Sequence, residues 1–224
     1  MRRAPGLLLL LLLLASRATA GDMPPPFYSA QPIRGSVVDA TTDLPLERVI
    51  IVAQWVLYRT TLGGENPHER LQVLETVTAS DGTYAFPGWG PKPNLPIVNL
   101  LLPIGYICCF LTDRDPELSI LKPGYRTLTL RNQRRRDTMV RVSDWDGKII
   151  KLEPFRGSLN EWATDLHFLQ GSLLWSDLDW RMAPRMLLAI ENERLRLPHK
   201  TDWSVSSLES LGTSREEILR ALGK

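Results

Sequence analysis

The sequence predicts a mainly β fold: an antiparallel sandwich of short strands, followed by an α-helical C-terminal extension. Two observations support this. Between residues 33 and 130, short apolar or alternating segments are separated by turn residues such as Asp81-Gly82. From Gly157 onward, the spacing of apolar residues changes to the helical period. We therefore expect a signal peptide over residues 1–20, a proline-rich extended lead-in over 21–32, a sandwich over 33–155 with an insertion at 88–116, and a helical extension over 156–224.

The first twenty residues have the pattern of a secretory signal peptide. Two arginines precede an unbroken leucine run over residues 7–14, and Ala18-Thr19-Ala20 follows it. This run is much shorter than the roughly 20 apolar residues of a membrane helix. We therefore expect cleavage near Ala20, a periplasmic or secreted protein, and no stable transmembrane span in the mature chain.

Cleavage would change the charge balance. The chain has 27 lysine and arginine residues against 25 acidic residues, and removal of the three arginines of the peptide leaves a net charge of −1. Nucleic-acid-binding domains are strongly basic, so we expect no nucleic-acid partner. One basic cluster is interpreted as a solvated loop, with an anionic lipid or lipopolysaccharide surface as its alternative partner; its members are Arg131, Arg134, Arg135, Arg136 and Arg141.

The two cysteines, Cys108 and Cys109, are adjacent. Consecutive Cα atoms are about 3.8 Å apart, whereas disulfides usually join Cα atoms about 4.4 to 6.8 Å apart. We therefore expect two buried thiols in an apolar strand, and a fold that depends on its hydrophobic core.

The β segments follow one another with distinct patterns. Residues 33–39 begin a strand, and residues 49–58 are apolar on both parities, as in a central strand covered on both faces. Further strands are predicted around Leu71, Val73 and Val77, around Tyr84 and Phe86, around Leu118 and Ile120, and around Leu128 and Leu130. Asp146-Gly147, between alternating segments at 140–142 and 150–152, predicts a hairpin.

Three stretches carry a family resemblance: residues 33–40 leading to Pro45-Leu46, residues 78–86, and residues 118–125. In these the chain resembles the carboxypeptidase regulatory-like domain, a small sandwich of the immunoglobulin-like and transthyretin-like kind. The resemblance covers about residues 33 to 130 and rests on core and turn residues. It implies a bacterial, noncatalytic accessory or interaction module, and related sandwiches include carbohydrate binders.

The insertion at residues 88–116 departs from the compact family pattern. Its apolar run at 97–111 contains Asn99, Pro103 and Gly105 and is too short for a membrane span. We expect a pair of buried strands or an apolar flap, in preference to a membrane re-entry. Inserted loops on a rigid sandwich often carry function.

Three amphipathic helices are expected after Gly157. Ser158 and Glu161 have capping-box spacing, and Gly171 is a plausible stop. The apolar face of this helix would contain Leu159, Trp162, Ala163, Leu166 and Leu169. A second helix begins near Pro184 and runs toward Leu197, and Thr213 with Glu216 predicts a third cap. We expect these faces to pack on the sandwich or on one another, with docking to a partner protein as the alternative.

The sequence contains no recognisable catalytic pattern. His68, His167 and His199 are far apart, without the short spacing of a zinc-binding pair, and Gly63-Gly64 is interpreted as a turn. We therefore expect no catalytic residues, no metal and no cofactor.

Seven tryptophans suggest a second kind of site, because an indole ring offers a flat apolar face to a sugar. We assign Trp55 to the core and Trp162, Trp175 and Trp180 to helix packing. Trp89 and Trp145 lie in or beside loops and are the candidate ligand contacts.

The expected function is a noncatalytic accessory or interaction module of the cell envelope, with another envelope protein or a glycan as its partner. The alternative is a carbohydrate- or envelope-polymer-binding protein. An enzyme of unrecognised type is the third possibility.

Overall fold

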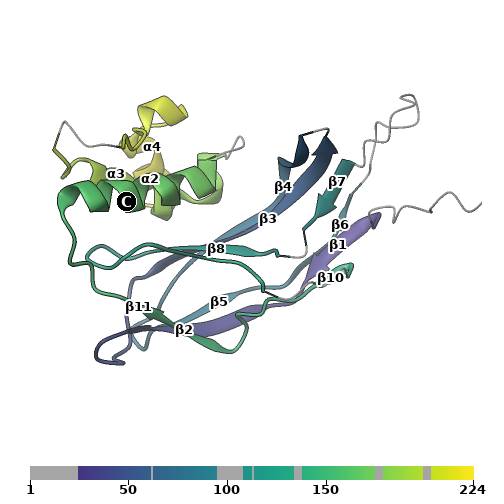
Figure 1. Ribbon diagram of the computed structural model, residues 1–224, viewed down its shortest axis with the longest axis horizontal. Coiled ribbons are helices and arrows are strands. Elements are labelled where there is room, and N and C mark those ends of the chain that lie inside the picture. The colour runs from purple at the N-terminus through teal and green to yellow at the C-terminus, as the bar shows by residue number, and fades with distance from the viewer. Residues whose placement is uncertain are drawn as a thin grey trace, which may run out of the picture.

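The computed structural model describes residues 25–61, 63–94, 108–112, 114–133, 138–174, 179–198 and 203–224. The expected signal peptide, residues 97–107 of the apolar run, Trp175 and His199 lie outside these residues. The described chain is mainly β, with several sheets in a sandwich-like arrangement and three C-terminal α-helices. The predicted fold class is therefore confirmed. Figure 1 shows three layers: helices above a long sheet, and two small sheets below it.

The long sheet forms the middle layer. Its strand order is β4 (Gly64–Val77), β3 (Ile50–Thr61), β8 (Glu117–Leu121) and β9 (Leu128–Leu130), and all neighbours are antiparallel. Strand β7 (Cys108–Leu111) pairs with the far end of β3, beyond β8. β3 is thus the central strand that residues 49–58 predict.

Two small sheets form the lower layer. One contains β11 (Lys148–Leu152), β2 (Ile33–Asp39) and β5 (Thr83–Phe86), and the other contains β10 (Val140–Arg141), β1 (Phe27–Ala30) and β6 (Trp89–Pro93). The end of the expected lead-in therefore forms a strand, β1, whose Tyr28 and Ala30 are buried.

The predicted hairpin at Asp146-Gly147 is wrong. The flanking strands do not pair with each other, because β10 runs parallel to β1 and β11 runs parallel to β2. The turn itself is present and is attached to the start of β2. The Arg34 amide donates to the Asp146 carboxylate over 2.8 Å, and the Gly147 amide donates to the Arg34 carbonyl over 2.7 Å. These contacts direct the chain along β2 instead of back along β10.

The sandwich core lies between the long sheet and the lower layer. On β3, alternate residues point into it, namely Ile51, Ala53, Trp55 and Leu57. Phe86 of β5 and Ile120 of β8 face the same space and are almost fully buried. Trp55 is 1% exposed, which confirms its assignment to the core.

The cysteine prediction is wrong, because Cys109 is disulfide-bonded rather than a free thiol. The backbone at Cys109 has a φ of 74°, an uncommon conformation for a residue other than glycine. The Asn94 side-chain amide donates to the Cys109 carbonyl over 2.6 Å and holds this backbone in place.

The helical layer contains α2 (Leu159–Leu174), α3 (Pro184–Arg194) and α4 (Arg215–Ala221), with 3₁₀ turns at Trp180–Met182 and Glu209–Leu211. The Ser158 and Glu161 capping box is confirmed, since the Ser158 amide donates to the Glu161 carboxylate over 2.7 Å. The third capping box lies one residue later than predicted, at Ser214 and Glu217. None of the helices in the described ranges is long and apolar enough to cross a membrane.

Two details of α2 differ from the prediction. Leu159 is 56% exposed rather than buried. Gly171 does not end the helix, which continues to Leu174. The last carbonyls of α2 accept hydrogen bonds from side chains of the sheet below: Gln54 donates to the Ser172 carbonyl over 2.9 Å, and Arg70 donates to that of Leu173. Tertiary contacts therefore satisfy this helix end in place of a glycine cap.

The helices pack on the outer face of the long sheet, as predicted. Val52 of β3 and Leu121 of β8 are fully buried there. The helical side chains that cover them are Trp162, Leu166, Leu169, Leu173, Met186 and Ile190. The middle sheet is thus apolar on both faces wherever the helices lie above it.

Replacing Leu166 by alanine tests this second core. Leu166 is fully buried between α2 and the sheet, so Leu166→Ala should lower the free energy of unfolding by about 2–5 kcal/mol. The matched control on the same helix is Leu159→Ala, expected to change it by less than about 0.5 kcal/mol. Urea denaturation measures the free energy of unfolding of both variants, and equal effects would contradict the packing of α2 on the long sheet.

Candidate binding cleft

A cleft of about 280 Å³ opens on the outer face of the long sheet, beyond the end of α2. On β3, Ile50 and Val52 lie under the helices, whereas Val56 and Tyr58 line the cleft. Its lining also includes Gln54, Glu65, Phe110, Thr112, Arg114, Asp115, Glu117 and Arg131. The cleft is therefore the part of the outer face that the helical layer leaves uncovered.

Polar side chains mark the boundary between helix-covered and open sheet. On β8, the outward-facing residues become polar along the strand, from Leu121 to Ser119 to Glu117. The hydroxyl oxygens of Ser119 and of Ser172 in α2 are 3.3 Å apart. On β3, the corresponding boundary residue is Gln54. Its amide nitrogen donates to the Glu117 carboxylate over 3.2 Å as well as to α2, and its oxygen accepts from Arg70 over 3.2 Å. Gln54 thus joins the helix end to the cleft.

Two aromatic residues share one side of the cleft. Tyr58 of β3 and Phe110 of β7 are direct partners across the strand pair, so their side chains lie next to each other on the same face. Both are half-buried. Burial raises the pKa of the Tyr58 phenol above its ordinary value, against the opposing effect of the Arg131 guanidinium. The hydroxyl therefore remains protonated near neutral pH and can donate a hydrogen bond.

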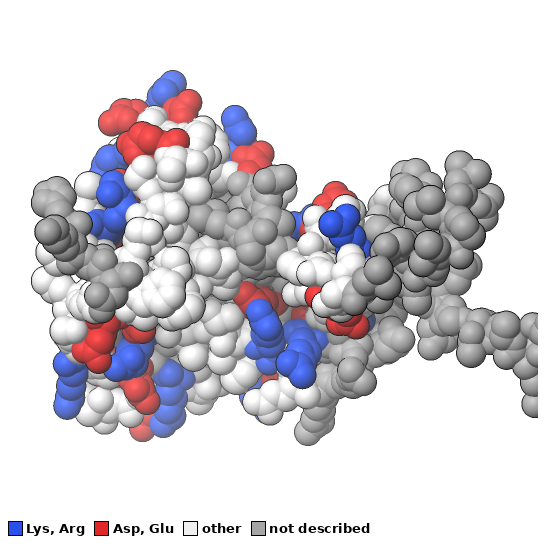
Figure 2. All heavy atoms as spheres, turned by 45° about the horizontal axis from the view of Figure 1, so that its top comes forward, with Lys and Arg blue, Asp and Glu red and all other residues white. Residues whose placement is uncertain are grey.

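Paired charges lie opposite these rings. Glu117, 8% exposed, accepts from both Gln54 and the Arg131 guanidinium, while Arg131 remains half-exposed. Figure 2 shows acidic and basic side chains interspersed over the visible face of the molecule.

Asp115, which lines the cleft, belongs to a buried ion pair with Arg141. Arg141 and Asp115 have 2% and 4% of their side chains exposed, and Arg141 Nε donates to Asp115 Oδ2 over 2.9 Å. Arg141 also donates to the carbonyls of Thr138, over 3.1 Å, and Thr112. The expectation that Arg141 belongs to a solvated loop is therefore wrong. Its carboxylate partner, 26 residues earlier in the chain, offsets the desolvation of the guanidinium.

The two candidate tryptophans lie apart. Trp89 packs edge-on against Trp55, with ring centroids 5.2 Å apart, and its indole nitrogen is buried without a hydrogen-bond partner in the described structure. Trp145 lines a second cavity of about 510 Å³, and its indole N–H donates to the Arg131 carbonyl over 3.1 Å. Neither ring lines the first cleft.

Sequence reasoning missed the residues that the cleft brings together: Tyr58, Phe110, Glu117 and Arg131. One signal was present. In two otherwise apolar strands, polar residues stand at positions whose side chains point outward, namely Gln54, Glu117 and Ser119. Among the described residues, no group of three or more histidine, cysteine, aspartate or glutamate side chains is placed to share a metal ion.

Comparisons with known proteins assign no family. No protein-family model and no curated protein matches the chain. Among solved structures, 3-chlorocatechol 1,2-dioxygenase from Rhodococcus opacus 1CP is 17% identical over 60% of this chain and 63% of that chain, with a TM-score of 0.31. A catechol 1,2-dioxygenase from Acinetobacter radioresistens is 16% identical over 59% and 53%, with a TM-score of 0.30. The major pilin SpaD of Corynebacterium diphtheriae is 15% identical over 59% of this chain and 32% of that chain, with a TM-score of 0.25.

This chain spans less than two thirds of each of these proteins. The similarities are distant ones to the β-sandwich domains of dioxygenases and to a pilin domain.

Replacing Asp115 by asparagine tests the buried ion pair of Asp115 and Arg141. Asp115→Asn leaves the Arg141 guanidinium buried without a counter-charge, which should cost about 3–5 kcal/mol of stability. The control is Asp43→Asn, which breaks the Lys151–Asp43 pair, whose side chains are 55% and 68% exposed. That change should cost less than about 1 kcal/mol. Chemical denaturation measures both variants, and a near-neutral Asp115→Asn would contradict the structural role given to this pair.

Proposed function

We propose that the protein is a noncatalytic accessory module of the cell envelope that binds a carbohydrate polymer in the cleft. The observation that carries this proposal is the meeting of two aromatic rings, Tyr58 and Phe110, with the hydrogen-bonding groups of Gln54, Glu117 and Arg131. A sugar ring has an apolar face that packs on aromatic rings and hydroxyls that both donate and accept. A small set of polar groups on an aromatic-lined cavity is the usual composition of a ligand site.

The charge of the cleft favours a neutral ligand. Its lining contains the acidic residues Glu65, Asp115 and Glu117 and the basic residues Arg114 and Arg131. A strongly anionic or cationic ligand would meet repulsion from one of these sets, whereas a neutral polyol meets donors and acceptors of both kinds.

The engagement of the carboxylates supports binding over catalysis. Asp115 is paired with Arg141, and Glu117 accepts bonds from Arg131 and Gln54. Both carboxylates are thus already engaged by side chains of the protein, which favours a role in holding the cleft and its ligand in place.

The resemblance to the carboxypeptidase regulatory-like domain supports the same proposal, because sandwiches of this kind include carbohydrate binders. The signal-peptide pattern of residues 1–20 supports a periplasmic or secreted location. In that location an envelope polysaccharide would be accessible to the cleft.

A protein-interaction role is the second candidate, and a separate surface favours it. Phe168 of α2 is 60% exposed and Trp203 is 43% exposed, with ring centroids 5.5 Å apart. His167 lies 4.7 Å from Trp203 between ring centroids. Aromatic residues such as tryptophan are enriched among the few residues that supply most of the binding energy of protein interfaces.

Binding to a glycan panel distinguishes the two candidates. Tyr58→Ala and Phe110→Ala should each weaken binding to the glycans retained by the wild type by about tenfold or more, because each removes a ring that packs on the sugar. Phe168→Ala is the matched control: it removes an exposed ring of the helical surface and should leave glycan affinity unchanged. Isothermal titration calorimetry measures the affinities. Wild-type protein that retains no glycan would reject the carbohydrate proposal.

A further inference from the structure

We infer that the ligand is an extended chain that leaves the cleft, crosses the end of β9 and occupies a second subsite around Trp145. This inference rests on the proposed function and specifies it further. The second subsite is the cavity of about 510 Å³ whose lining includes Trp145, Ser143, Asp144 and Lys148. It combines one indole ring with carboxylate, hydroxyl and ammonium groups, a composition that again suits a polyol.

Residues 131–133, directly after β9, contribute to both cavities. The Arg131 guanidinium lines the first cleft and pairs with Glu117 there, whereas the Arg131 carbonyl accepts the indole N–H of Trp145 over 3.1 Å. Two residues later, the Gln133 amide donates to the Asp144 carboxylate over 2.8 Å, and both residues line the second cavity. Both cavities therefore border the same short segment, one through Arg131 and the other through Gln133.

Asn132 makes this connection rigid. It is 4% exposed, and its side-chain amide donates to the carbonyls of Asp115, which lines the first cleft, and Val142, which lines the second. Its side-chain oxygen accepts from the Asp144 amide over 2.8 Å. A rigid spacing between two subsites is what a polymer of regular repeat requires, because little ordering free energy is then spent on binding the second unit.

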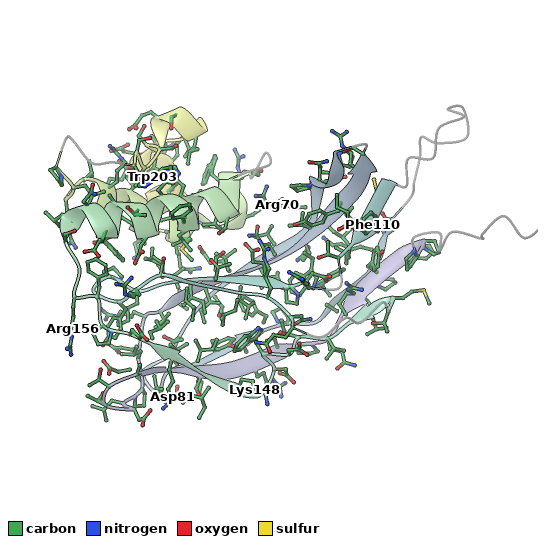
Figure 3. The ribbon with its side chains drawn as sticks, in the orientation of Figure 1. Arg70, Asp81, Phe110, Lys148, Arg156 and Trp203 are labelled. Carbon is green, nitrogen blue, oxygen red and sulfur yellow. The ribbon has the colours of Figure 1, made fainter. Side chains whose placement is uncertain are left out.

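The size of the first cleft supports a second subsite. About 280 Å³ lies at the lower end of the range for small-molecule sites, so a polymer can place only a short part of its chain there. Figure 3 places Phe110 beside the long sheet and Lys148 at the lower layer. A ligand that contacts both must therefore pass over the edge of the sandwich, which a linear oligosaccharide can do and a single sugar cannot.

Dependence of affinity on chain length tests this inference. The probes are cello-oligosaccharides and chito-oligosaccharides, from disaccharide to hexasaccharide, titrated by calorimetry into the full mature protein. The wild type should bind a hexasaccharide about tenfold or more tightly than the disaccharide. Trp145→Ala should abolish that gain, because the second subsite loses its ring.

Trp145 packs against the core, so its replacement could also disturb the fold. A second variant at an exposed residue avoids this problem. Lys148→Ala alters an exposed side chain of the same cavity and should reduce hexasaccharide affinity alone. Equal affinity for all chain lengths in the wild type would overturn the second subsite and leave the proposed function standing. Failure of every oligosaccharide to bind would overturn both.

Discussion

The first half of strand β3 is buried on both faces, and the three layers of the molecule follow from this burial. Its inward residues, such as Trp55, form the core against the lower layer, and its outward residues near Ile50 and Val52 are covered by helices. A strand that is apolar on both faces requires a layer on each side. The helical extension therefore completes the middle sheet, and the molecule has three layers because this strand has two apolar faces.

The cleft exists because β3 is longer than the part of it that the helices cover. β3 has 12 residues, and the helical layer covers only the part that begins at Ile50. Where α2 ends, the outward side chains become polar, and Gln54 bonds both to the helix end and to Glu117. The polar residues that satisfy the end of the helix thus also form one wall of the cleft.

The sequence predicts what depends on local pattern. The two-sided apolar pattern of residues 49–58 predicts the central strand, and Ser158 with Glu161 predicts the start of α2. It does not predict what depends on distant partners. Asp146-Gly147 has the composition of a hairpin turn, but the start of β2 decides where the chain goes. Helix α2 continues beyond Gly171 because Gln54 and Arg70 donate hydrogen bonds to the carbonyls that follow it. The cleft is the extreme case, since register alone places Gln54 beside Glu117 and Tyr58 beside Phe110.

On the proposed function, the uncovered outer face of β3 binds an extended carbohydrate. The most direct measurement is the change in backbone amide chemical shifts of isotopically labelled protein on titration with a hexasaccharide that it retains. If the carbohydrate binds there, the largest changes should fall on Gln54, Tyr58, Glu117 and Trp145. Changes confined to the helical surface around Phe168 would contradict it.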